Sequence, residues 1–341
     1  MFLSTHKSIL AVAAIVLAVG GASLCLGEGP ASGASGGPLS CAMPQQDRAS
    51  PHPGMVWVPG GSFDLGDSVY AEELPIRPVS VAGFWMDRTE VTNKQFAEFV
   101  LATGYVTAAE RPVDARLVAG LPPEMREPGA VVFVPPKAVN RRGDVTQWWR
   151  FIPGASWRHP GGPQTTIAGR GSFPVVAVTF EDAKAYARWK GSDLPTEAEW
   201  EWAARAGQAS AGQDHEQPKG ANTWQGVFPM LNSADDGFTG LAPVGCYAPN
   251  ALGLFDMIGN VWELTSDAYT PNHNGPIAGT PDQVPPDMRK TSSGQRVIKG
   301  GSFLCSPDYC LRYRSGARQP QDDDLGASHL GFRTILAAPG P

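Results

Sequence analysis

The chain lacks an excess of positive charge. Its 27 lysines and arginines are outnumbered by 33 aspartates and glutamates, which gives a net charge of -6 at pH 7. Proteins that bind nucleic acid need a basic field to attract the phosphates. We therefore expect no nucleic-acid partner.

Common enzyme signatures are also absent. The sequence has no GxGxxG that opens a helix, no P-loop, no HExxH and no CxxC pair, which argues against the usual nucleotide and zinc-hydrolase sites. There is no fixed-period repeat and no regular strand–helix alternation. His159, in SWRHPGG, fits a turn or core position better than a metal ligand.

Cysteine is scarce, with five in 341 residues. The N-terminus carries Lys7 and an apolar run at 9–22 followed by small residues, which is typical of a secretory signal peptide. We expect residues 1–26 to be this signal, or else a retained membrane anchor, and the protein to be exported (periplasmic or secreted). A lipid anchor is a lesser alternative. Removal of Cys25 would leave four cysteines, too few for a disulfide scaffold in a domain of this size.

The segment after the signal differs in composition. Residues 27–54 are rich in glycine, serine and proline and are predicted to be a disordered linker. The remainder, 55–337, is expected to fold as a single domain. With 40 glycines and 32 prolines, but also 10 tryptophans and 42% hydrophobic residues, the chain should be folded and rich in loops.

Local patterns predict a few regular elements. Gly60 and Gly61 interrupt an alternating apolar stretch and suggest a hairpin, while 79–92 and 173–180 look like further strands.

Three helices are marked by capping residues. Thr92 with Gln95, Thr179, and Thr196 with Glu199 should each begin one, and Gly104 and Gly207 should end the first and the last.

The stretch KGGSFLCSPDYCLRYRSGAR contains the most informative pair, Cys305 and Cys310. Two thiolates suit a soft ion such as Cu(I), and Arg312, Arg314 and Arg318 could lower the thiol pKa values. A short-loop disulfide and half of a zinc site remain open from the residues alone, although no second Cys/His pair is evident for zinc.

The sequence closely resembles the formylglycine-generating enzymes, the oxidases that activate sulfatases. The resemblance runs from about Met55 to Ile335 and implies an α+β, loop-rich fold of the formylglycine-generating-enzyme and C-type-lectin-like superfamily. The stretch around the cysteine pair is its most specific part. The matching segments, in order, are GFWMDRTEVTNKQFAEFVLATGYVTAAE, GASWRHPGG, LPTEAEWEWAARAG, ANTWQGVFP, GLFDMIGNVWELTSD and RVIKGGSFLCSPDYCLRYRSGAR…SHLGFR.

The resemblance implies an oxidoreductase that converts a cysteine in a C-x-P/A-x-R segment of an unfolded sulfatase to Cα-formylglycine. O2 and a thiol reductant would be the co-substrates. Cys305 and Cys310 would hold Cu(I), with the substrate thiolate as a third sulfur ligand, and Ser302 would lie beside them. Further pocket residues would be Trp262, Tyr309 and His329, although Trp262 also fits a core aromatic and Tyr309 a packing residue.

The resemblance also implies two structural Ca2+ sites, an ion that prefers hard oxygen ligands. Calcium 1 would use side chains of Asn222 and Asp236 and backbone of Thr223 and Phe238. Calcium 2 would use side chains of Asp256 and Glu263 and backbone of Gly259 and Val261. Residues Asp235 to Gly237 equally read as an ordinary turn, and Glu263 as a buried ion-pair partner.

Some positions depart from the family pattern. Ser315 and Thr334 stand where animal relatives have cysteines, Leu264 stands where an aromatic residue is common, and His329 stands where Asn also occurs. The main alternative function is a non-catalytic lectin-like or cell-envelope interaction module of the same fold. An iron-dependent sulfoxide synthase would need a separate helical domain with clustered histidines, which the chain lacks.

Overall fold

The computed structural model describes residues 41, 50–140, 144–207, 215–274 and 294–338. The chain divides into two units, Met1–Gly37 and Pro38–Pro341. The first unit, with the predicted signal segment 1–26, lies outside the described residues, as does most of the predicted linker. All of the described residues belong to the second unit.

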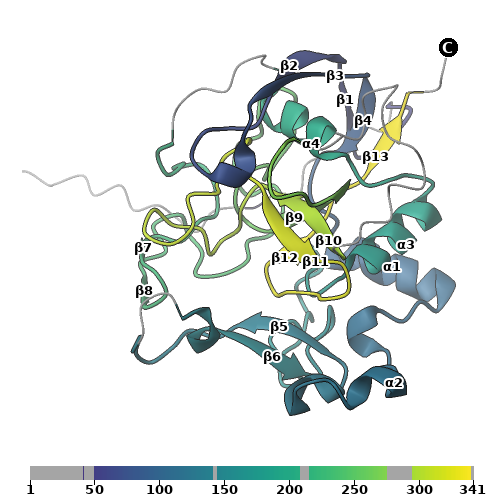
Figure 1. Cartoon of the computed structure of the whole chain (residues 1–341). Helices are drawn as coiled ribbons and strands as arrows, with labels where there is room; N and C mark the ends of the chain where they lie inside the picture. Colours follow the sequence, from purple (N-terminus) through teal and green to yellow (C-terminus); the bar gives the residue numbers. More distant parts are fainter. Residues whose placement is uncertain (1–40, 42–49, 141–143, 208–214, 275–293, 339–341) are drawn as a thin grey trace, which may run out of the picture. The chain divides into compact units, whose positions relative to one another are not determined.

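Two small sheets carry most of the paired backbone (Figure 1). The first has the order β1-β4-β13 and is antiparallel throughout. The second has the order β11-β10-β9-β12, in which β12 runs parallel to β9. The strands of these sheets are β1 (Met55–Val58), β4 (Phe84–Asp87), β13 (Ile335–Ala337), β9 (Trp262–Ala268), β10 (Gln295–Lys299), β11 (Gln319–Asp322) and β12 (Leu330–Gly331).

Three two-stranded hairpins complete the described strands. They pair β2 (Gly61–Leu65) with β3 (Arg77–Val81), β5 (Gly129–Phe133) with β6 (Trp149–Pro153), and β7 (Gly226–Val227) with β8 (Leu231–Asn232).

The hairpin predicted at Gly60 and Gly61 is wrong. β1 pairs with β4 and β2 pairs with β3, so the glycines join two sheets rather than reverse the chain within one. The reason is a close backbone approach, since a Cβ on Gly60 would lie 2.8 Å from the Gly83 nitrogen and 2.9 Å from the Val81 oxygen.

The three predicted helix starts are confirmed. Reciprocal capping boxes occur at Thr92, Thr179 and Thr196, and they satisfy amide groups that would otherwise lack partners. The last of these helices ends at Ala204 with Arg205 as its C-cap, and Gly207, at φ 76°, closes it by donating to the Trp202 carbonyl at 3.1 Å, one residue later than predicted. The α-helices are α1 (Asn93–Thr103), α2 (Ala115–Val118), α3 (Phe180–Lys190) and α4 (Glu197–Ala204), with short 3-10 turns at Ala71–Glu73, Ala108–Glu110, Pro123–Arg126 and Val145–Gln147.

The strand predicted at 173–180 is buried but irregular. Val175 and Ala177 donate single backbone hydrogen bonds to Val91 and Ala327, from two different parts of the chain. Ala177 has φ 57°, which breaks the extended conformation. The burial predicted from the apolar run is therefore confirmed, and the regular strand is wrong.

The largest described core cluster joins helices α1 and α3 to the cysteine stretch. It contains Phe96, Tyr186 and Trp262 together with both Cys305 and Cys310. Within the residues that the structure covers, no helix combines the length and apolar character needed to span a membrane.

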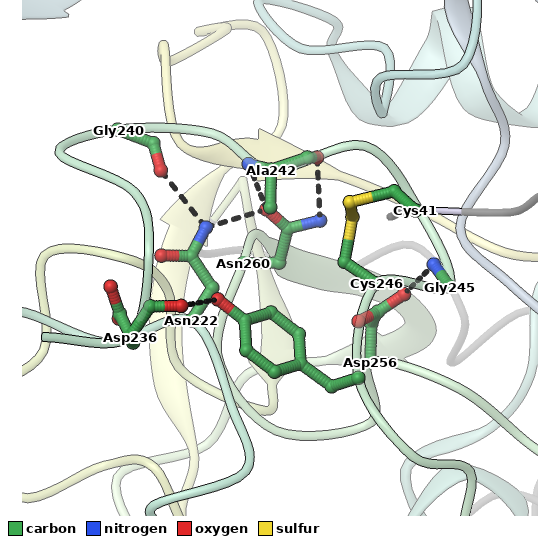
Figure 2. Close-up of a disulfide and its surroundings, with 10 residues drawn as sticks. Cys41, Asn222, Asp236, Gly240, Ala242, Gly245, Cys246, Asp256 and Asn260 are labelled. Atoms are coloured by element: carbon green, nitrogen blue, oxygen red, sulfur yellow. Dashed lines mark hydrogen bonds between the residues drawn. A yellow bond between two sulfur atoms is a disulfide. The ribbon is translucent and has the colours of Figure 1, made fainter. Parts of the chain in front are cut away.

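A disulfide links Cys41 to Cys246, 205 residues apart in sequence. Cys41 lies in the segment 27–54 that was predicted to be a linker, most of which lies outside the described residues. The bond joins Cys41 to the loop that precedes Asp256, where the Gly245 amide donates to the Asp256 carboxylate (Figure 2).

Candidate active site

The six residues predicted for the active site line one cavity of about 520 Å³. Cys305, Cys310, Ser302 and Trp262 lie buried in its wall, and Tyr309 and His329 are partly exposed. The six residues come from the start of β9, from the cysteine stretch after β10 and from the residue before β12. Further lining comes from Trp149, Gln295, Arg312 and the strand Gln319–Asp322.

The cysteine stretch follows β10 through a turn that requires glycine. Gly300 has φ 93°, and a Cβ there would lie 2.9 Å from the Met257 oxygen. The Cys305 amide then donates to the Ser302 carbonyl at 2.9 Å, and the Cys305 carbonyl accepts from the Trp224 amide at 3.0 Å. These bonds fix the first cysteine on both sides.

Strand pairing places the opposite wall. Trp262 begins β9 and pairs in parallel with Leu330 of β12. The Trp262 amide donates to the His329 carbonyl at 2.8 Å. His329 directly precedes the edge strand β12, and this bond ties its backbone to the first residue of the inner strand β9.

The two thiols lie together. Their Sγ atoms are 2.6 Å apart, both cysteines are free, and the separation exceeds the ~2.05 Å of a disulfide bond. The contact with the Cys305 thiol and the nearby Arg312 lower the pKa of Cys310, whereas burial raises the pKa of Cys305. The pair thus favours one shared proton. Among the described residues, no group of three or more His, Cys, Asp or Glu side chains could hold a metal ion, so the zinc alternative gains no support.

Only one of the three arginines acts on the thiols. Arg312 lies beside Cys310, pairs with Glu72 and stacks over Tyr70. Arg314 instead binds Asp67 and Glu73, and Arg318 binds Glu197 at 2.9 Å. The prediction that all three lower the thiol pKa values is therefore wrong for the last two.

A polar and aromatic wall faces the thiols. The Ser302 hydroxyl lies 3.2 Å from His329 Nδ1, and Trp149 packs on the His329 ring at 4.6 Å. Trp149 Nε1 also donates to the Tyr309 hydroxyl at 3.3 Å. Burial lowers the pKa of His329 below its ordinary range, so its imidazole is neutral near pH 7.

The residues of the first predicted calcium set come together. The Asp236 carboxylate accepts from the Thr223 amide at 2.9 Å and from the Phe238 amide at 3.1 Å. Asn222 donates to Gly240, while its buried Oδ1 receives no hydrogen bond from a described residue (Figure 2). A buried carbonyl oxygen without a donor beside a carboxylate fits a hard cation.

The second predicted set fits less well. Asp256 accepts from the Gly245 amide, but Glu263 is bound by Arg333 at 2.6 and 2.7 Å and by Trp200 Nε1 at 2.8 Å. The ion-pair interpretation of Glu263 is confirmed by these contacts. Its two oxygens already face a cation, so they do not need calcium.

Sequence reasoning missed a buried carboxylate next to this set. Glu90 is fully buried, accepts from Asn260 Nδ2 at 3.0 Å, and its carboxyl is hydrogen-bonded to that of Asp256. Burial and neighbouring Asp256 raise the pKa of Glu90, and burial raises that of Asp256 to about 6. Trp149 was also missed, because nothing in its local pattern separates it from other tryptophans.

Known proteins resemble this chain over most of its length. A formylglycine-generating enzyme from Mycobacterium tuberculosis is 48% identical over 289 residues, which cover 82% of this chain and 97% of that protein. A Mus musculus protein named inactive C-alpha-formylglycine-generating enzyme 2 is 36% identical, over an alignment that covers 89% of this chain and 92% of that protein. The solved structure of PvdO from Pseudomonas aeruginosa has a TM-score of 0.57 at 24% identity, covering 83% of this chain and 94% of PvdO, which indicates a shared fold.

The sulfatase-modifying factor enzyme 1-like domain matches residues 40–338. This span contains both sheets, the cavity and both cysteines of the buried pair. The chain therefore belongs to the formylglycine-generating enzyme family, in its sulfatase-modifying factor enzyme 1-like domain.

Proposed function

We propose that this protein oxidises a cysteine in a C-x-P/A-x-R segment of an unfolded sulfatase to Cα-formylglycine. Its co-substrates would be O2 and a thiol reductant. The observation that carries the proposal is the pair of buried free thiols, 2.6 Å apart, at the wall of a cavity of about 520 Å³. Family membership supports the same reaction.

The overall electron balance limits what the site must do. The substrate carbon loses two electrons when its thiol becomes an aldehyde, and two further electrons come from the reductant. One O2 accepts all four, and the sulfur leaves as sulfide. The cavity must therefore admit an extended peptide, orient one Cβ and keep bulk water from that carbon.

Named side chains can meet these needs. Trp149 and Tyr309 form an aromatic wall that a peptide can pack against. Ser302, held by neutral His329, presents a hydroxyl to polar atoms of the substrate or of oxygen. Arg312 favours negative charge at the thiols and would also attract an incoming thiolate.

Cys305 and Cys310 are the residues that would hold Cu(I), which would supply one-electron redox chemistry when bound. Two thiols in a buried site fit a soft ion by their donor chemistry. An ion held by both sulfurs needs them farther apart than 2.6 Å. The non-ligating Cys41 and Cys246 are joined to each other and do not compete.

Calcium is proposed as a structural ion. The donors would be Asn222 and Asp236 with carbonyls of Thr223 and Phe238, and separately Asp256 with carbonyls of Gly259 and Val261. Because Arg333 occupies Glu263, the carboxyl of Glu90, which lies directly beside that of Asp256, is the better second carboxylate for the latter site. Calcium affinity should then fall for Glu90→Gln and change little for Glu263→Gln, as titration calorimetry would show.

We also infer export, with the sulfatase met before it folds. The Cys41–Cys246 disulfide supports an oxidising compartment.

The proposed reaction is tested with purified protein loaded with Cu(I). A C-x-P-x-R peptide should gain an aldehyde that reacts with an aminooxy probe, and the same peptide with Ser in place of Cys should not. Removal of O2 or of the thiol reductant should stop turnover. A loaded protein that binds the peptide but never forms the aldehyde would instead support the non-catalytic interaction module.

A further inference from the structure

The β7–β8 hairpin exposes apolar side chains beside the cavity. Val227 is 58% exposed, Met230 46% and Leu231 60%, and neighbouring Tyr309 is 37% exposed. Monomeric soluble proteins rarely leave several large apolar side chains together in water without a use for them. We call these four residues the apolar ledge.

Hydrogen bonds hold the backbone of the hairpin that carries Val227, Met230 and Leu231. Trp224 Nε1 donates to the Leu231 carbonyl at 2.9 Å, and the Ser233 amide donates to the Gln225 carbonyl at 2.7 Å. The Met230 amide closes the turn on the Val227 carbonyl at 3.0 Å. An ordered turn that displays apolar groups loses little entropy when a partner covers them.

The ledge is continuous with the cavity. Phe228, between Val227 and the tip of the hairpin, stacks on Tyr309 with ring centroids 3.9 Å apart and an interplanar angle of 9°. The Phe228 amide donates to Asp308, which lies between the two cysteines in sequence. Tyr309 lines the cavity, so an apolar surface leads from the hairpin to the thiols.

We propose that the apolar ledge binds an apolar stretch of the unfolded client polypeptide, next to the cysteine that enters the cavity. This inference rests on the proposed function, because the occupant is the same chain that the site would oxidise. An unfolded chain exposes apolar side chains that folding would bury, and covering them on the ledge is favourable. The ledge itself carries no charge.

A membrane surface is a poorer occupant. Surface-binding segments combine apolar groups with lysine or arginine that contact anionic lipid. Here the hairpin is hydrogen-bonded to the acidic Asp308 through the Phe228 amide, and the whole chain has a net charge of -6. A second copy of this chain would also cover the ledge and is an outcome of the test.

The test compares two peptides with the same C-x-P-x-R core, one short and one extended on both sides by apolar residues. The variant is Val227→Thr with Leu231→Thr, which places β-branched residues, suited to strands, at both positions. The control is Leu101→Ser on α1, 88% exposed and away from the cavity lining. We expect the KM of the long peptide to rise about tenfold in the hairpin variant, the change expected when ~60 Å² of apolar contact is lost. The short peptide and the control variant should be unaffected.

Equal KM values for the long peptide in wild type and hairpin variant would overturn the proposal. Two other results would also overturn it, in each case if the hairpin variant still binds the long peptide as wild type does. The first is that wild type binds phosphatidylcholine–phosphatidylglycerol vesicles and the variant does not. The second is that wild type forms a concentration-dependent dimer and the variant does not. If the short peptide is never oxidised, the proposed function fails separately. Fluorescence anisotropy of the labelled long peptide still reports whether the ledge binds it.

Discussion

Replacing Arg333 with Met should destabilise the protein severely. Arg333 is 0% exposed and Glu263 1%, and their side chains form two hydrogen bonds of 2.6 and 2.7 Å. The guanidinium also donates to the carbonyls of Asp87 and Phe255 at 3.2 and 2.9 Å. The arginine therefore joins β4, β9 and the loop before Asp256.

The expected loss of stability comes from the buried carboxylate of Glu263, which the substitution leaves unpaired. Glu263 would stay buried without its cation, close enough to Glu90 and Asp256 to raise their pKa values further. Removing one partner of a buried ion pair costs about 3–5 kcal/mol. We expect a loss near the upper end, since the two backbone carbonyls lose their donors as well.

Urea denaturation followed by tryptophan fluorescence measures this loss. Arg333→Lys should recover part of the stability, because an ammonium keeps the charge but cannot make both bonds at once. The double variant Glu263→Gln with Arg333→Met should be more stable than the sum of the single losses predicts. A loss below about 1 kcal/mol for Arg333→Met would mean that Glu263 does not depend on this cation, contrary to the contacts described.

Two further predictions concern stability. The Cys41→Ala and Cys246→Ala double variant should lose about 3–5 kcal/mol of unfolding free energy, measured by denaturation without reductant, because the disulfide closes a long loop. A non-reducing digest in which the Cys41 and Cys246 peptides are not linked would contradict this. Burial alone would raise the pKa of Glu197, but Arg318 and Lys299 lower it below its usual range. Its contribution is therefore complete at neutral pH and lost as the pH falls below about 4. The stability difference between wild type and Glu197→Gln should narrow over that range, and a difference that is constant with pH would argue against the ion pairs.

Features set by short stretches of sequence were predictable. Thr92, Thr179 and Thr196 satisfy amides within their own first turn, so their roles depend on nothing distant. The apolar run at 173–180 was correctly expected to be buried. Its secondary structure depends on Val91 and Ala327, which lie far away in sequence, and no local pattern reveals them.

The candidate site likewise has residues that could be predicted from the sequence and residues that could not. Cys305 and Cys310 stand out because their spacing and setting match the family, and the structure brings Ser302, Trp262, Tyr309 and His329 to the same cavity. Trp149 reaches that cavity from a different hairpin, through packing that its own neighbours in sequence do not encode.

Buried charges were the hardest part to predict. Arg314 and Arg318 follow the cysteines in sequence, yet their guanidinium groups bind Glu73 and Glu197 on other elements. Glu90 likewise lies in a helix-entry segment, and only the fold places it beside Asp256. Residue spacing indicates which charges are near in sequence, whereas pairing depends on the long-range topology.

Aldehyde formation in a C-x-P-x-R peptide by matched cysteine variants tests the role of the buried thiols most directly. Wild type and the Cys41→Ala and Cys246→Ala double variant, each loaded with Cu(I), should convert the peptide, whereas Cys305→Ser and Cys310→Ser should each lose conversion while still binding it. Conversion that persists in both serine variants, or that depends on Cys41 and Cys246 instead, would contradict the assignment of the buried thiol pair as the working centre.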